Sequence, residues 1–166
     1  MVSVSRSRTE FAPSSPKVSE NANPDISMII LDTSGIVAAY NRCEAEHAAA
    51  RDLLTATTEP LAVTPLVLAE VDYLSTKYLG VPGAVTLLTE LDRPATVASF
   101  GNEDLRTATA LLARYQDLRL GLTEAANVVV AARYKTTRLF SLDGHYLAVR
   151  PQDGAAFTLL PAQSRP

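Results

Sequence analysis

Four carboxylates stand where a folded chain can gather them around one metal ion: Asp32, Glu70, Glu124 and Asp143. Each lies within or beside an apolar run of the sequence. An ionised carboxylate is costly to bury unless it is paired, hydrogen-bonded or bound to a metal. Acids repeatedly placed at the margins of hydrophobic segments therefore predict a shared cation. A divalent ion held by carboxylates is typical of enzymes that hydrolyse phosphate esters.

Each acid also has a purely structural explanation. Asp32 can cap the helix that follows it, and Glu124 can complement the positive end of a helix. Asp143 precedes a glycine, and this dipeptide is common in turns. Glu70 can pair with a basic side chain at the edge of an apolar stripe. We favour a shared site because all four acids lie within or beside apolar runs, which one fold can bring together.

Glu70 gives the sharpest local signal. It lies on a predicted helix that begins at Thr64-Pro65, with threonine as the N-cap and proline in the first turn. On that helix it shares a face with apolar neighbours three and four positions away, namely Leu66, Val67, Tyr73 and Leu74. An acid on an apolar stripe requires a partner.

Composition limits the classes of protein to consider. With 166 residues, 47% of them hydrophobic and 20% charged, the chain suits one domain with a proper core. One cysteine, Cys43, excludes an internal disulfide and favours a reducing cytoplasm, and His47 and His145 form no zinc-binding pattern. The net charge of −3 means that nucleic-acid binding would depend on local basic patches and metal ions. No apolar stretch approaches the ~20 residues of a membrane span.

The chain divides into three parts. Residues 1–27 are rich in serine, proline and asparagine with balanced charges, and we predict a disordered extension. Residues 28–161 form the predicted domain, and residues 162–166 a short tail.

Strands and helices alternate within the domain. Strands are predicted at 28–31, 61–63, 96–100, 138–142 and 157–160, and helices at 35–40, 44–56, 65–78, 83–91, 102–115 and 123–134. This order predicts an α/β protein, with a mostly parallel central sheet between two helical layers. Asp32 and Asp143 follow strands, and α/β sheets hold their sites at the carboxyl ends of strands.

The segments that carry the acids also resemble a known family. They are Ile-Ile-Leu-Asp-Thr-Ser, Thr-Pro-Leu-Val-Leu-Ala-Glu-Val-Asp-Tyr-Leu, Leu-Gly-Leu-Thr-Glu-Ala-Ala and Leu-Phe-Ser-Leu-Asp-Gly-His-Tyr. In order and context they resemble the PIN-domain ribonuclease toxins of the VapC type, and the resemblance covers residues 28–161.

The resemblance implies a cofactor, an activity and partners. Asp32, Glu70, Glu124 and Asp143 would bind Mg²⁺ or Mn²⁺ and catalyse endonucleolytic cleavage of a structured RNA such as tRNA or rRNA. A VapB-like antitoxin would neutralise the toxin, and homodimers are usual in the family. Thr33, Ser34 and Asn127 lie beside these acids in the sequence or on the same helix, and we consider them as supporting residues.

Glu124 departs from the family pattern, which usually has aspartate at this position. Mg²⁺ demands near-ideal octahedral geometry, whereas Mn²⁺ is more forgiving. We expect Glu124 to be a weaker or water-mediated ligand, with activity retained and a preference for Mn²⁺.

Two other readings of the function remain open. A catalytically impaired PIN scaffold could act by binding protein or RNA. A phosphatase similar to haloacid dehalogenases would need a second aspartate two residues after Asp32, where this chain has Ser34. Basic residues of the C-terminal half could contact phosphates or simply form a solvated face: Arg114, Arg119, Arg133, Lys135, Arg138 and Arg150. Tyr146, like Tyr115 and Tyr134, fits a core position better than a base-stacking one.

Overall fold

A five-stranded parallel sheet forms the centre of the domain. The computed structural model describes residues 28–150 and 154–162, so the predicted extension and nearly all of the tail lie outside the described residues. The strands are β1 (Ile29–Leu31), β2 (Leu61–Val63), β3 (Ala95–Val97), β4 (Arg138–Phe140) and β5 (Thr158–Leu160). They pair in the order β3-β2-β1-β4-β5, and every pairing is parallel.

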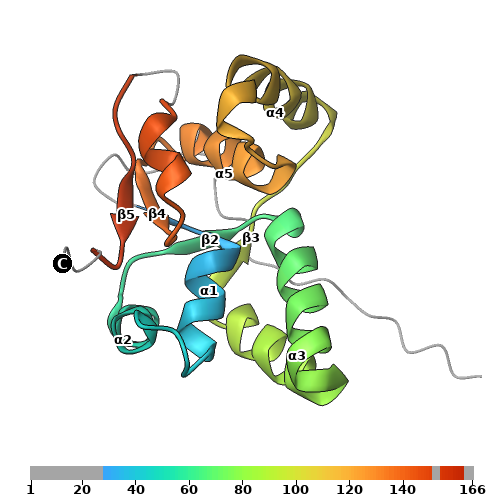
Figure 1. Ribbon diagram of the computed structural model, residues 1–166, viewed down its shortest axis with the longest axis vertical. Helices are drawn as coiled ribbons and strands as arrows, with labels where there is room; N and C mark the ends of the chain where they lie inside the picture. The colour runs from blue at the N-terminus through green and yellow to red at the C-terminus, as the bar shows by residue number, and fades with distance from the viewer. Residues whose placement is uncertain (1–27, 151–153, 163–166) are drawn as a thin grey trace, which may run out of the picture.

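Helices cover both faces of this sheet, as Figure 1 shows. One layer contains α1 (Thr33–Tyr40), α2 (His47–Ala56) and α3 (Pro65–Asp92), and the other contains α4 (Asn102–Arg114) and α5 (Leu122–Arg133). Two short 3₁₀ helices are η1 (Gln116–Leu118) and η2 (Gly144–Ala148). The predicted three-layer α/β/α architecture is confirmed.

The sequence of β1 explains why two cores form. Successive side chains of a strand point to opposite faces of the sheet. Ile29 and Leu31 accordingly pack with α1, α2 and α3, whereas Ile30 packs with α5 and η2. All three residues are buried, as expected for a strand covered on both faces.

Several predicted boundaries were wrong by a few residues. The second helix begins at His47 instead of Glu44, and the third strand is Ala95–Val97 instead of 96–100. The N-cap of α4 is Gly101 and not Asn102, because the Asp104 carboxylate accepts a hydrogen bond from the backbone N–H of Gly101 at 2.8 Å. Here an acid in the first helical turn reaches back to the residue before the helix.

The predicted break near Gly80 is a kink within α3. Gly80 has φ 72° and ψ 171°, in the region that strongly favours glycine. Pro82 follows in the first turn of the second half, where its missing N–H leaves no helical bond unmade. The second half of α3 thus bends away from the first half, which carries Glu70.

The order in which the chain adds strands to the sheet reverses between β1 and β4. From β1 it proceeds through β2 to β3 at one edge, and β4 then returns to the other side of β1. Binding sites of open α/β sheets lie at such a switch point. A Cβ atom on Gly35 would lie 2.4 Å from the carbonyl oxygen of Phe140, so glycine lets α1 approach the end of β4. In the part of the chain that the structure describes, no helix is long and apolar enough to cross a bilayer.

Candidate active site

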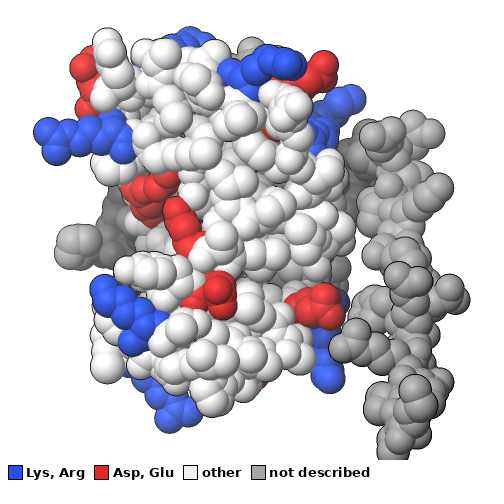
Figure 2. All heavy atoms as spheres, turned by 90° about the vertical axis from the view of Figure 1, so that its right-hand side faces the viewer, with Lys and Arg blue, Asp and Glu red and all other residues white. Residues whose placement is uncertain are grey.

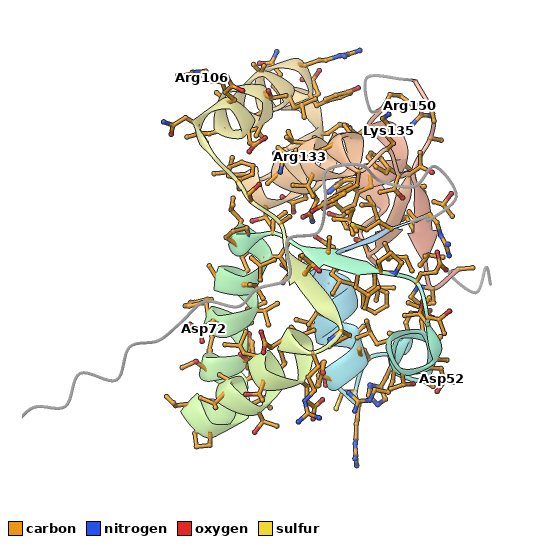
Figure 3. The ribbon with its side chains drawn as sticks, turned by 180° about the vertical axis from the view of Figure 1, so that it is seen from behind. Asp52, Asp72, Arg106, Arg133, Lys135 and Arg150 are labelled. Carbon is orange, nitrogen blue, oxygen red and sulfur yellow. The ribbon has the colours of Figure 1, made fainter. Side chains whose placement is uncertain are left out.

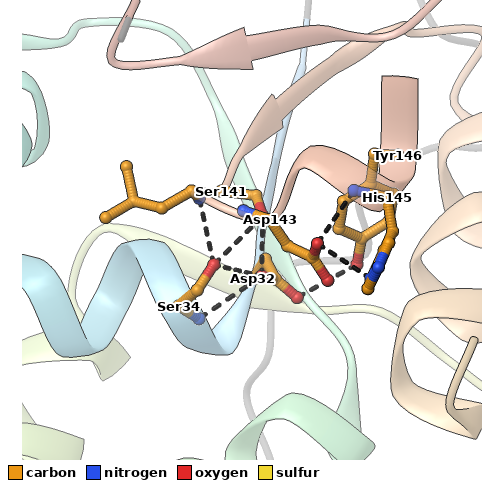
Figure 4. A network of polar contacts seen from close by, with 7 residues as sticks. Asp32, Ser34, Ser141, Asp143, His145 and Tyr146 are labelled. Atoms are coloured by element: carbon orange, nitrogen blue, oxygen red, sulfur yellow. Dashed lines mark hydrogen bonds and ion pairs between the residues drawn. The ribbon is translucent and has the colours of Figure 1, made fainter. Parts of the chain in front are cut away.

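Asp32 lies at the centre of a dense hydrogen-bond network at the end of β1. It is 4% exposed and caps α1 by accepting a hydrogen bond from the backbone N–H of Ser34. The hydroxyls of Ser34 and Ser141 lie 2.6 and 2.8 Å from its Oδ2. Figure 4 shows these two serines, from α1 and from the end of β4, pointing at the carboxylate. The same carboxylate therefore caps α1 and forms the centre of the candidate site.

The other oxygen of Asp32 is held by two different groups. Asn127 donates an amide N–H to Oδ1 at 3.0 Å, and the Tyr146 hydroxyl donates to the same atom at 3.0 Å. Both side chains are fully buried. The predicted support by Ser34 and Asn127 thus takes the form of direct hydrogen bonds to Asp32.

Glu70 is held by threonine hydroxyls from two other helices. Thr33 of α1 donates to Oε2 at 2.7 Å, and Thr123 of α5 donates to Oε1 at 2.5 Å. These bonds connect three helices around one carboxylate. Thr33 thus supports Glu70 and not Asp32.

The argument that placed Glu70 on a buried apolar stripe was wrong. Glu70 is exposed, and Tyr73 on the same helix face is 64% exposed. Of the other apolar neighbours predicted for this face, Val67 is buried and Leu66 and Leu74 are half-buried, and the buried face of α3 continues through Val71. Helical spacing identified residues that share a face but could not tell that this face is open.

Glu124 lies in the first turn of α5, as predicted, and is half-buried. Burial raises the pKa of its carboxyl, and the negative charges of Asp32, Glu70 and Asp143 raise it further. A hydrogen bond from its own backbone acts in the opposite direction. The cost of ionising Glu124 shows that the four acids share one electrostatic environment.

Asp143 follows β4 and caps η2. Its Oδ1 accepts a hydrogen bond from the backbone N–H of His145 at 2.9 Å and lies 3.1 Å from His145 Nδ1. The His145 side chain is 59% exposed. Figure 4 shows Asp143 turned towards this histidine, on the side of Asp32 where Tyr146 lies.

The structure places the four acids at one end of the sheet without forming a ready metal cage. Among the described residues, no three histidine, cysteine or acidic side chains converge as a set that could hold an ion. Within the same residues, no lysine or arginine forms an ion pair with the four acids. Figure 2 shows acidic side chains across the middle of one face, between the half that carries α3 and the half that carries α4 and α5.

Three hydroxyl residues of the site were missed from the sequence. They are Thr123 on Glu70, and Ser141 and Tyr146 on Asp32. Thr123 directly precedes Glu124, and Ser141 lies two residues before Asp143, so proximity to an acid was an available signal. Tyr146 had none, because its predicted core position is correct and only the fold shows where its hydroxyl points.

Comparison with known proteins agrees with this geometry. The family model of the PIN domain matches residues 29–150. Ribonuclease VapC26 of Mycobacterium tuberculosis (strain ATCC 25618 / H37Rv) is 38% identical over 135 residues, which is 80% of this chain and all of that protein.

Two solved structures share the fold. The crystal structure of Mycobacterium tuberculosis VapC20, a sarcin-ricin loop cleaving toxin, matches with a TM-score of 0.64 and 22% identity over 70% of this chain and 90% of that one. VapBC2 from Rickettsia felis, bound to a DNA fragment from its promoter, matches with a TM-score of 0.52 and 18% identity over 66% and 83% of the two chains. Together with the family model and the relative, these findings show that the chain belongs to the PIN domain family and, within it, to the VapC ribonuclease toxins.

Proposed function

We propose that this protein is a metal-dependent endoribonuclease toxin that uses Asp32, Glu70, Glu124 and Asp143 to bind Mg²⁺, with Mn²⁺ as an alternative. Its substrate is a structured RNA such as tRNA or rRNA, and it acts in the cytoplasm. The observation that carries the proposal is the shared electrostatic environment of four acids that form no ion pair with a described lysine or arginine.

The donor set fits a hard divalent cation. All four groups offer carboxylate oxygens, which Mg²⁺ and Mn²⁺ prefer. Burial, and then the charges of the three other acids, raise the pKa of Glu124, and a bound cation would relieve that repulsion between charges. Hydroxyls of Thr33 and Thr123 orient Glu70, and those of Ser34 and Ser141 orient Asp32. Ligand carboxylates are commonly held by such hydrogen bonds.

The chemistry requires no nucleophilic side chain. A bound divalent ion would polarise the scissile phosphate and lower the pKa of the attacking water. The residues of the chain hold the ligand carboxylates of Asp32 and Glu70 in place through hydroxyl and amide hydrogen bonds. Ser34, where a phosphatase similar to haloacid dehalogenases would need aspartate, instead donates its hydroxyl to Asp32.

The basic residues first considered for RNA binding are mostly engaged elsewhere. Arg133 ends α5, whereas Glu124 begins it, and Arg133 bonds to Ser99 and Asp104. Arg138 bonds to Glu59 at the start of β4, at the opposite end of the sheet from the acids. Figure 3 shows Arg133, Lys135 and Arg150 on the upper part of the molecule and Asp72 along α3. These positions weaken the assignment of this set to phosphate binding.

An apolar hollow next to the acids supports an antitoxin partner. It has a volume of about 390 Å³ and lies between α3 and the strands β2 and β3, lined by Val63, Leu68, Ala69, Leu88, Leu91, Asp92, Ala95 and Val97. Ala69 directly precedes Glu70. A VapB-like segment that places apolar side chains in this hollow and a basic one among the acids would block the site.

Exposed apolar side chains on both sides of the kink in α3 support self-association. Five large apolar side chains of this helix are 57–71% exposed: Tyr73, Tyr78, Leu79, Val81 and Val85. Several large apolar side chains exposed along one helix favour a protein interface there. We assign it to a homodimer. The helix face around Leu53 and Leu54 is less suitable for an interface, because both side chains pack against the core.

RNA cleavage by two variants tests the metal site. Asp32→Asn and Glu70→Gln remove one ligand charge each, and both are expected to lose RNA cleavage at least 100-fold with Mg²⁺ or Mn²⁺. Asp52→Asn is the matched control, since Asp52 is exposed on α2, at the lower edge of the molecule in Figure 3, and is not among the acids that raise the pKa of Glu124. Circular dichroism verifies that each variant folds. Cleavage at the wild-type rate by a folded Glu70→Gln would overturn the assignment.

The same assay separates the enzyme from an impaired scaffold. An active wild-type protein whose cleavage stops with a chelator supports the enzyme. A folded wild-type protein that cleaves no RNA with either metal supports the scaffold, for which Glu124 in place of the usual aspartate is the one sequence argument.

A further inference from the structure

We propose that Tyr146 is a positioning residue of this site: its buried hydroxyl fixes Asp32 relative to Asp143. The inference rests on the proposed metal-dependent function, because it concerns the arrangement of two proposed ligands. Tyr146 is 0% exposed and is the largest of the fully buried side chains. Its ring belongs to the core between the sheet and the α4–α5 layer, whereas its hydroxyl reaches the carboxylate at the end of β1.

The hydroxyl closes a cycle of three hydrogen bonds. Asn127 Nδ2 donates to Asp32 Oδ1 and to the Tyr146 oxygen, each at 3.0 Å, and the Tyr146 hydroxyl donates to Asp32 Oδ1 at 3.0 Å. The two hydrogens of one amide group thus serve two acceptors, and the single hydroxyl proton is left for the carboxylate.

The orientation of this cycle is fixed from outside. Thr64 donates its hydroxyl to Asn127 Oδ1 at 3.4 Å, which places the NH₂ group of the amide on the side of Asp32. Within the described residues, no buried side-chain polar atom lacks a hydrogen-bond partner, as expected for a fully connected network.

Tyr146 connects two site acids because of its place in the chain. It lies in η2, the single 3₁₀ segment that Asp143 caps, three residues after that acid. The position of its ring therefore determines where η2 and its N-cap lie. With its hydroxyl on Asp32, the same side chain ties the end of β1 to the loop after β4. Tyr146 therefore connects the two carboxylates: its hydroxyl contacts Asp32, and its backbone lies three residues after Asp143.

The ring and the hydroxyl have separable roles. The ring packs edge-on against Phe157, with centroids 6.0 Å apart and planes at 73°. That contact stabilises the core and does not involve the hydroxyl. Removing only the oxygen atom should therefore disturb the position of Asp32 while keeping the packing of η2.

The test compares Mn²⁺ affinity of the full chain without RNA, measured by electron paramagnetic resonance. Tyr146→Phe is expected to bind Mn²⁺ on the order of 10-fold or more weakly, the usual cost of removing a hydrogen bond that orients a ligand. Its cleavage rate should recover when Mn²⁺ is raised to saturation. Asn127→Ala removes the other donor to Oδ1 and should show the same weakening, which keeps the test decisive if the phenylalanine variant does not fold.

Two controls separate positioning from packing. Phe157→Leu removes the ring contact but no hydroxyl, and should lower the melting temperature while keeping wild-type Mn²⁺ affinity. Tyr115→Phe removes a hydroxyl that accepts a hydrogen bond from the backbone N–H of Arg150 at 3.3 Å, and should leave Mn²⁺ affinity unchanged.

The outcomes distinguish this inference from the proposed function. If the wild-type protein binds Mn²⁺ and a folded Tyr146→Phe binds it equally well, the positioning role is overturned and the metal site stands. If the wild-type protein binds no Mn²⁺, the metal-dependent function fails and the role of Tyr146 fails with it.

Discussion

The carboxylate of Glu124 folds back over Gly121. A Cβ atom on Gly121 would lie 2.5 Å from Glu124 Oε2, closer than Cβ atoms approach other heavy atoms in proteins. The backbone of Gly121, with φ −84° and ψ 171°, is open to any residue, so the requirement for glycine is one of space. The carboxylate of Glu124, which reaches further than the usual aspartate would, occupies the space that a side chain at residue 121 would need.

Gly121→Ala is expected to weaken Mn²⁺ binding about 10-fold with little loss of stability. The added methyl group must displace the Glu124 carboxylate, but the end of a flexible side chain moves at low cost. The free energy of unfolding should change by less than about 1 kcal/mol. Mn²⁺ titration and urea unfolding measure the two effects.

The control combines Gly121→Ala with Glu124→Asp, which shortens the neighbouring acid. In a Glu124→Asp background, Gly121→Ala should leave Mn²⁺ affinity unchanged, because the aspartate does not extend over residue 121. Glu124→Asp alone should raise the Mg²⁺-supported cleavage rate relative to the Mn²⁺-supported rate. Equal effects of Gly121→Ala in both backgrounds would refute the proposed fit.

Glu124→Gln is expected to stabilise the metal-free protein at neutral pH. The raised pKa of Glu124 means that the native state binds its proton more tightly than the unfolded chain does. Stability therefore falls as pH rises from the ordinary value of 4.5 through the raised native value, and the full penalty is present above it. Thermal unfolding without metal should show a higher melting temperature for the variant at pH 7.5 and no gain below pH 4.5.

Glu103→Gln is the matched control for this pH dependence. Glu103 also lies in the first turn of a helix, α4, but it is exposed and is not among the acids whose charges raise the pKa of Glu124. Its neutralisation removes a favourable interaction with the helix dipole and should give no gain at pH 7.5. A gain of equal size in both variants would mean that general surface charge is responsible.

Gly35→Ala is expected to destabilise the protein by roughly 2 kcal/mol or more and to abolish cleavage. Its methyl group would lie 2.4 Å from the Phe140 carbonyl oxygen and 2.7 Å from the Phe140 ring. Helix α1 must then move away from β4, which separates Ser34 from Ser141. Gly144→Ala is the control, because nothing lies within 4 Å of its Cβ position. Equal unfolding midpoints in urea would contradict this packing.

Leu79→Arg is expected to convert a dimer to a monomer while RNA cleavage is retained. Leu79 is 57% exposed in the kinked part of α3, so a charge there costs the monomer little but disfavours an apolar interface. Sedimentation velocity measures the mass. Leu105→Arg, on α4 and 43% exposed, should leave the mass unchanged. A wild-type monomer at all concentrations would refute the homodimer.

The sequence alone predicted the layered fold because its signals are local. Apolar strands such as Ile29–Leu31 and the Thr64-Pro65 helix start depend on neighbouring residues, and alternation of strands and helices then permits few topologies. The boundaries that failed, such as Gly101 in place of Asn102, depend on a side chain that reaches back from the next turn.

The four acids were also predicted from the sequence, together with their location at one end of the sheet. Thr33, Ser34 and Asn127 were also expected as supporting residues, but only the structure showed which carboxylate each one contacts. It also added the hydroxyls of Thr123, Ser141 and Tyr146. Thr123 and Glu70 are 53 positions apart, and Tyr146 and Asp32 are 114 apart. Such contacts depend on the crossing of packed elements and leave no periodic trace in the chain. The sequence thus determined the charges that could bind a metal, and tertiary packing decided the hydroxyls that orient them, because a hydrogen bond depends on distance in space and not on separation in sequence.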